Sequence, residues 1–148
     1  MVLQRIQTVY LLLAIIVMAV FAFFPALNID TNQGTVLYGA LATGLPEKTH
    51  PDLLLIILDV LVIIIAFIAM FQYRNLQRQM TLCGVDIILL LAMLIAIGIV
   101  AYTQKGFADK IHFTWFDLLP CLAIVLIAFA HKCIANDKRK LADSERIR

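Results

Sequence analysis

The chain has 148 residues, 63% of them hydrophobic, and a formal net charge of +2. With a mean hydropathy of +0.95, it is far more apolar than a soluble globular domain, in which about 45–50% of residues are apolar. This composition excludes a soluble enzyme, and the small net charge gives no indication of nucleic-acid binding. There is no long polar segment for a separate water-soluble domain, so we expect one membrane domain over residues 1–148.

The first apolar run covers residues 8–27, after a short head in which Arg5 is the only charged residue. It is longer than the apolar core of a signal peptide, which has about 7–15 residues. It also ends in Phe23, Phe24 and Pro25, not in a small-residue cleavage site. We therefore expect a retained first membrane span.

Residues 28–50 contain most of the turn-forming residues of the chain. These are Asn28, Asp30, Asn32, Gly34, Gly39, Gly44 and Pro46. Between them, residues 35–38 and 40–43 are short and partly β-branched, which predicts two short strands and a β-hairpin in this first outer loop. The hairpin either covers the ends of its own helices, which we favour, or faces a partner.

Two further spans are expected at residues 51–71 and 82–102. The apolar runs at residues 53–71 and 82–102 each carry one charge, Asp59 and Asp86. Each run has about 20 residues, the length that a helix needs to cross roughly 30 Å of hydrocarbon. Pro51 suits the first turn of the second helix, which Thr49 or His50 would cap, and Thr81 would cap the third helix. Residues 72–80 form a polar turn between these spans.

The fourth span is expected at residues 114–135, after an outer loop at residues 103–113. Thr114 and Asp117 have the spacing of a capping box at its start. Residues 136–148 form a highly charged tail in which the charge signs alternate from Lys138 onward. This pattern is typical of a solvent-exposed helix and could extend the fourth helix into the cytoplasm.

The basic residues predict the orientation of these spans. Three lie on one proposed side, Lys48, Lys105 and Lys110. Nine lie on the other: Arg5, Arg74, Arg78, Lys132, Lys138, Arg139, Lys140, Arg146 and Arg148. We therefore expect an all-α membrane protein with both termini in the cytoplasm (N-in/C-in). Its fold would be a four-transmembrane-helix antiparallel bundle, because the connections are short.

Small and polar residues predict the packed faces of the helices, since hydrophobicity does not drive helix association in lipid. One stripe is expected in each of three spans. The stripes are Ala14, Ala22 and Ala26 in the first, Ala92 and Ala96 in the third, and Asp117, Cys121, Ile124, Ala128 and His131 in the fourth. We interpret them as helix contacts, because no heme, quinone or nucleotide motif accompanies them.

An acid inside a membrane span is a functional candidate, because its burial is costly. Asp117 has a structural explanation as the capping-box partner of Thr114. For Asp86, near the start of the third helix, the helix dipole and nearby arginines would compensate the charge. These arginines are Arg5, Arg74 and Arg78.

Asp59 has no such explanation within its own helix. It lies near the middle of the second span, Leu58 and Val60 flank it, and no polar residue lies one turn away. It must find its partner on another helix or in another protein. If a residue of this chain handles protons or ions, we expect it to be Asp59.

No other motif indicates chemistry. Cys83, Cys121 and Cys133 fall near the cytoplasmic face or inside a span, where structural disulfides are rare. His131 and Cys133 are two residues apart and point in different directions on a helix, which argues against a metal site. Neither Ser/His/Asp nor Walker-type spacing occurs. We therefore expect no enzymatic activity, no cofactor and no metal.

Four segments resemble one known family. They are the head at residues 1–13 with its Gln4-Arg5-Ile6-Gln7-Thr8 core, the central Asn75, Gln79, Leu82 and Cys83, residues 115–120, and the ending at residues 137–148. The chain resembles domain-of-unknown-function family 4293, small four-span membrane proteins of the Bacteroidetes. The family tends to place arginine after the central asparagine, where this chain has Leu76. The resemblance implies a multi-pass protein of the bacterial inner membrane and no assigned activity.

The recognisable polar residues gather on the proposed cytoplasmic face. They are Arg5, Gln7, Arg74, Asn75, Arg78, Gln79, Arg146 and Arg148. They could contact anionic lipid, to which each basic residue contributes on the order of 1 kcal/mol. They could also contact a membrane-protein partner or a second copy of the chain, for which the glutamines supply hydrogen bonds. We expect a non-enzymatic accessory or scaffold subunit; the alternative is a small transporter or lipid-binding protein using Asp59.

Overall fold

The computed structural model describes residues 2–25, 27–32, 34–41, 43–45, 48–50, 53–104, 106 and 110–146, with no side-chain description at residues 2–4, 43–45, 48–50, 104 and 110. Most of these residues lie in four long helices. The helices are α1 (Val2–Phe23), α2 (Leu53–Phe71), α3 (Leu76–Gln104) and α4 (Leu118–Arg146). A one-turn 3-10 helix, η1 (Trp115–Asp117), precedes α4.

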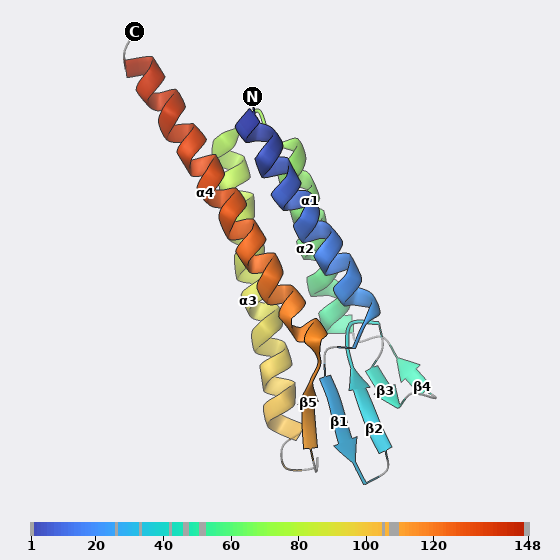
Figure 1. Ribbon diagram of the computed structural model, residues 1–148. Helices are drawn as coiled ribbons and strands as arrows, with labels where there is room; N and C mark the ends of the chain where they lie inside the picture. Colours follow the sequence, from blue (N-terminus) through green and yellow to red (C-terminus); the bar gives the residue numbers. More distant parts are fainter. Residues whose placement is uncertain are drawn as a thin grey trace.

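The four helices pack side by side and consecutive helices run in opposite directions (Figure 1). α1 contacts α2 and α4, and α3 also contacts α2 and α4. The start of α1, the turn between α2 and α3 and the last turns of α4 lie at one end, which we call the terminal end. The strands lie at the other, the sheet end, and α4 extends beyond the other helices at the terminal end (Figure 1).

Each helix buries residues that are alternately three and four positions apart. This is the spacing that keeps one stripe facing the neighbouring helices in left-handed packing. In α1 the stripe is Gln7, Leu11, Ala14, Met18 and Phe21; in α2 it is Leu55, Asp59, Val62, Ala66 and Ala69; in α3 it begins Gln79, Cys83, Asp86, Leu90 and Met93; in α4 it is Pro120, Ala123, Ile127, Ala130 and Ile134. The outward faces are also apolar, as at Ile16, Ile88 and Phe129, which suits helices surrounded by lipid.

The small-residue stripes only partly identify the buried faces. Ala14 is buried as expected, but Ala92 is exposed, and in α4 Cys121 and Ala128 of the expected face are exposed. The prediction for α4 is therefore wrong. Alanines occur on several sides of this helix, so that small size does not select one face, whereas the alternating spacing from Pro120 to Ile134 does. Ala26 lies outside the described residues.

The strands form one antiparallel sheet in the order β4-β3-β2-β1-β5. They are β1 (Leu27–Thr31), β2 (Gly34–Tyr38), β3 (Thr43–Leu45), β4 (Lys48–His50) and β5 (Lys110–Phe113). β1 pairs with β2, Ile29 opposite Val36, and with β5, Asn28 opposite His112. Gly34, at the turn into β2, has φ 126°, a conformation that residues with a Cβ rarely adopt.

The expected hairpin is only part of this sheet. The predicted strand at residues 35–38 corresponds to β2, but the one at 40–43 is wrong, because residues 39–41 form a bend and β3 begins at Thr43. The first span was expected to continue to residue 27, whereas α1 ends at Phe23 and Leu27 begins β1. β5 lies about 80 residues from its partner β1, and short local patterns carry no signal for such distant pairing.

α3 begins earlier than expected, within the predicted turn at residues 72–80. The Asn75 side-chain Oδ1 accepts a hydrogen bond from the backbone N–H of Arg78 at 3.3 Å, and the Asn75 carbonyl accepts one from Gln79 at 3.0 Å. Asn75 is therefore the N-cap of α3. The expectation that Thr81 caps this helix is wrong, because its hydroxyl donates to the Gln77 carbonyl inside the helix at 3.1 Å.

The capping box expected at the start of α4 is incomplete. The Thr114 side chain makes no capping hydrogen bond, and the Asp117 carboxylate interacts with the Thr114 backbone N–H without a hydrogen bond of normal geometry. The chain instead enters α4 through η1, in which the Asp117 backbone N–H donates to the Thr114 carbonyl at 3.0 Å. α4 then continues to Arg146, well past the expected end of the span at residue 135. Thr49 and His50 lie in β4, and residues 51 and 52 lie outside the described residues.

Candidate functional sites at the terminal end and in the helical core

The terminal end carries most of the residues that the sequence singled out. Arg5, Arg74, Asn75 and Arg78 are all exposed there, on the start of α1, the α2–α3 turn and the first turn of α3. The Arg74 Cζ lies 5.9 Å from the centre of the Tyr73 ring, within the range of a cation–π contact. Two segments that are distant in sequence, the start of α1 and the α2–α3 turn with the first turn of α3, therefore present positive charge at one end of the molecule.

The last part of α4 extends this surface away from the other helices (Figure 1). Arg146 is exposed and lies nine residues after Asp137, which is roughly 14 Å further along the helix at 1.5 Å per residue. Arg146 is therefore separated from the arginines of the α2–α3 turn. Arg148 lies outside the described residues.

A surface pocket of about 360 Å³ lies beside the α2–α3 turn. It is lined by Ile68, Gln72, Gln77, Arg78, Thr81 and Leu82. The Lys138 Nζ from α4 donates a hydrogen bond to the Gln77 Oε1, so cationic groups from two helices lie at or next to the pocket. Because Arg78 and the aliphatic side chains of Ile68 and Leu82 line it, the pocket can accommodate an acidic group attached to an apolar chain.

Gln7 and Gln79 do not lie on the surface of the terminal end. Each is 1% exposed, because each occupies a position in the buried stripe of its helix. The Gln7 Nε2 donates a hydrogen bond to the Asp137 Oδ2 on α4, and the Gln79 Oε1 has no hydrogen-bond partner among the described residues. This corrects the expectation that these two glutamines supply hydrogen bonds to a partner; they belong to the interior.

Two carboxylic acids lie in the middle of the packed helices. Asp59 is 2% exposed and Asp86 is 1% exposed. Within the described chain, the Asp59 Oδ1 and both Asp86 carboxylate oxygens lack a hydrogen-bond partner. The arginines expected to compensate Asp86 are exposed at the terminal end, and no ion pair to Asp86 occurs among the residues described, so this expectation is wrong.

Asp59 and Asp86 lie at nearly the same level. Asp59 is 12 residues before the end of α2 at Phe71, and Asp86 is 10 residues after the start of α3 at Leu76. Because a short turn joins these antiparallel, contacting helices, the two levels differ by about 3 Å along the helix axis. A buried charge at either position would need a proton or a cation to neutralise it.

Gln79, Cys83 and Asp86 follow one another on the buried stripe of α3. They form a line of polarisable and polar groups from the terminal end toward Asp59 on α2. In the described residues, no group of three or more His, Cys, Asp or Glu could hold a metal ion. The three cysteines are free, Cys83 being buried and Cys121 exposed. The two buried carboxylic acids, Asp86 at the end of this line and Asp59 beside it, are groups that could take up and release a proton.

Sequence reasoning missed the interhelical hydrogen bonds made by Asp137 and Lys138. A signal was available for Asp137, because it continues the alternating spacing of Ala130 and Ile134 on α4 by three residues. The apolar run ends before this position, and the residue was therefore treated as part of a solvated tail. The side chain that packs against α1 is polar because it lies at the end of the helical core.

The four helices are long and apolar enough to cross a membrane, at Arg5–Phe23, Leu53–Phe71, Leu76–Thr103 and Trp115–Arg146. These features define the class of multi-pass helical membrane proteins. The profile of a family described as domain of unknown function (DUF4293) matches residues 3–147, so the chain belongs to this family. The family membership expected from the head, centre and tail of the sequence is confirmed. No curated protein matches the chain.

We predict that the hydrogen bond between Gln7 and Asp137 stabilises the folded protein by linking α1 to α4. In a double-mutant cycle of Gln7→Leu and Asp137→Ala, we expect a coupling of about 1 kcal/mol, the size typical of interhelical hydrogen bonds in membrane proteins. Reversible unfolding of the purified protein in mixed micelles measures it. Asp143→Ala, the same change at an exposed position of this helix, is the control. Strictly additive effects of the two substitutions would contradict this contact.

Proposed function

We propose that the protein is a non-enzymatic accessory or scaffold subunit of the bacterial inner membrane that binds a partner protein through its terminal end. In this proposal the four helices form an antiparallel four-span bundle with both termini in the cytoplasm. The bias of arginine and lysine toward the terminal end supports this orientation.

The observation that carries the proposal is the extension of α4. Its residues from Arg139 to Arg146 are all exposed, and this segment, which follows the hydrogen bond between Lys138 and Gln77, stands away from the other helices (Figure 1). A short helix without tertiary packing is only marginally stable in water. A partner that packs against this segment would supply the missing contacts, as in other complexes that recognise one face of a helix.

Leu141 gives this segment an apolar contact point. It is 58% exposed and has charged residues on both sides, Lys140 before it and Asp143 shortly after it. The exposed arginines Arg74 and Arg78 would add positive charge to the same contact surface. We therefore expect the partner to present an apolar groove bordered by acidic side chains.

A second candidate function rests on Asp59 and Asp86. Two buried acids without compensating cations at one level of the helices, and the buried Gln79 and Cys83 between them and the terminal end, would suit a small transporter that moves protons or cations. A lipid-binding role for the same interior is less well supported, because the described pockets lie at the helix ends.

We predict that Leu141 is needed for binding of the partner. The protein carries an affinity tag on a flexible linker after Arg148, is purified gently from its native membrane, and its partners are quantified by mass spectrometry. Leu141→Gln should lower the recovery of a stoichiometric partner by roughly tenfold, because a buried leucine contributes about 1.5–3 kcal/mol. Ala142→Gln, an equally neutral change at the next exposed position, should have little effect.

Recovery of the wild-type protein without any protein partner would contradict the accessory role. Charge reversal at Arg74 and Arg78 should also reduce partner recovery. Since these arginines contribute to membrane orientation, the topology of that variant must be checked independently.

The second candidate makes a different prediction. If the protein moves protons, proteoliposomes containing it should dissipate an imposed pH gradient, which an internal pH-sensitive dye reports. Asp59→Asn and Asp86→Asn should abolish this activity, because asparagine cannot take up and release a proton, whereas Asp143→Asn should not. A wild-type protein that leaves the gradient intact would exclude this candidate, and partner recovery should be unchanged in Asp59→Asn if the accessory role holds.

A further inference from the structure

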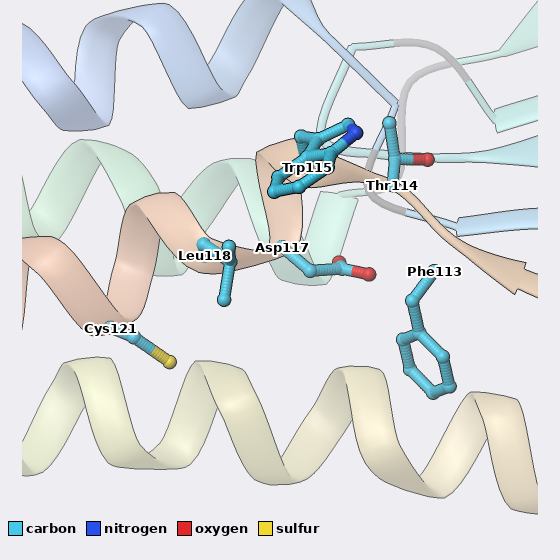
Figure 2. Close-up of a pocket in the computed structure, with 6 residues that line it drawn as sticks. All are labelled: Phe113, Thr114, Trp115, Asp117, Leu118 and Cys121. Atoms are coloured by element: carbon cyan, nitrogen blue, oxygen red, sulfur yellow. The ribbon is translucent and has the colours of Figure 1, made fainter.

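A cavity of about 480 Å³ lies at the sheet end, where β5 passes through η1 into α4. Figure 2 shows the six side chains that line it, Phe113, Thr114, Trp115, Asp117, Leu118 and Cys121. The Asp117 carboxyl group points toward the end of β5 and lies between Leu118 and Phe113 (Figure 2). The cavity is at the opposite end of the molecule from the proposed contact surface, and no residue of that surface contributes to it.

The polar groups of this cavity are incompletely paired. Both carboxylate oxygens of Asp117 and the Thr114 hydroxyl oxygen are shielded from solvent and have no hydrogen bond of normal geometry among the described residues. The Thr114 backbone N–H interacts with the Asp117 carboxylate but leaves most of its acceptor capacity unused. The other lining residues are apolar or weakly polar. Buried polar groups in folded proteins are normally hydrogen-bonded, and leaving one unpaired is costly. These atoms belong to residues that line one cavity but lie just behind its surface, so a ligand that donates hydrogen bonds and carries positive charge could pair with them after a small side-chain movement.

The position of the cavity indicates where this ligand comes from. The apolar segment of α4 that is long enough to span a membrane begins at Trp115, so the cavity lies at the edge of a span. Trp115 is 85% exposed and Phe113 is 67% exposed, and exposed aromatic side chains at the end of a span are typical of the lipid headgroup region. A membrane lipid can therefore reach this cavity directly from the bilayer.

We propose that this cavity binds one phospholipid whose headgroup carries a primary ammonium group. The ammonium N–H groups donate to the Asp117 carboxylate, and the Thr114 hydroxyl donates to a phosphate oxygen of the same lipid. An acyl chain lies against Leu118 and Cys121. The largely exposed Phe113 ring turns aside to admit the headgroup.

The charge of the cavity favours this lipid over the other common classes. An anionic headgroup without an amine would place its negative charge beside the Asp117 carboxylate. A trimethylated headgroup keeps the positive charge but has no N–H to donate, so it leaves the carboxylate oxygens unpaired. Charge-assisted hydrogen bonds are about twice as strong as neutral ones, and discrimination therefore comes from the N–H donors.

The tryptophan at the cavity provides the measurement. Trp115 is the only tryptophan of the chain, so that intrinsic fluorescence of the full-length protein reports on this site. The protein is reconstituted into phosphatidylcholine vesicles that contain a small fraction of phosphatidylethanolamine with brominated acyl chains, which quench tryptophan. We expect phosphatidylethanolamine to bind roughly tenfold more tightly than brominated phosphatidylcholine at the same fraction, the ratio expected for a hydrogen bond to a charged group.

Substitutions test whether the cavity causes the preference for phosphatidylethanolamine. Asp117→Asn should reduce the affinity for phosphatidylethanolamine to that for phosphatidylcholine, and Asp117→Glu should retain part of the preference. Asp30→Asn is the matched control, because it makes the same change at the same end of the molecule. Asp30 is already engaged, with the Thr35 hydroxyl at 2.8 Å and His112 at 3.4 Å, and its loss should leave the preference unchanged.

Two results would overturn the proposal. Equal quenching by brominated phosphatidylethanolamine, phosphatidylcholine and phosphatidylglycerol in the wild-type protein would show that the lipids form only a non-selective shell. A preference that survives in Asp117→Asn would place the lipid site elsewhere. The wild-type comparison does not depend on any variant, so it decides the proposal even if a substitution prevents folding.

Discussion

The requirement that every backbone polar group be satisfied inside hydrocarbon determines the architecture of this protein. It forces the four apolar segments into helices, and the alternating three- and four-residue spacing then decides which side chains meet. Because both helix faces are apolar, packing follows this spacing and not a contrast between polar and apolar sides. The same spacing brings Gln7, Gln79, Asp59 and Asp86 into the interior. The interior polar groups are therefore consequences of the packing that holds the helices together.

The two ends of the molecule differ in chemistry, and α4 links them. At the sheet end α4 begins beside a cavity with an incompletely paired carboxylate and exposed aromatic side chains. At the terminal end it makes hydrogen bonds to α1 and α3 through Asp137 and Lys138, and then extends beyond them. A change in how α4 packs would alter both ends. This arrangement suits a protein that holds a lipid on one side of a membrane and a protein partner on the other.

The sequence was sufficient to predict the four long helices, because a run of about 20 apolar residues has the length and composition of a membrane-spanning helix. It also predicted β2 and the family. It did not predict contacts between distant segments. The pairing of β5 with β1 joins residues that are far apart in the chain. The burial of Gln7 and Gln79 depends on which face of each helix packs against its neighbours. Local rules failed at helix starts, where Asn75 and not Thr81 caps α3 and where η1 follows Thr114 in place of a complete capping box. At these positions several polar residues could cap the helix, and the tertiary packing determines which of them does.

The proposed contact surface is cytoplasmic only if both ends of the chain lie on the inner side of the membrane. Accessibility of single cysteines to a membrane-impermeant maleimide tests it directly, in a variant whose three native cysteines are replaced. In right-side-out vesicles, His112→Cys at the sheet end should be labelled at once, and Ser144→Cys on the α4 extension only after the membrane is permeabilised. Labelling of Ser144→Cys in sealed vesicles, with His112→Cys protected, would show the opposite orientation and contradict the proposed cytoplasmic contact surface.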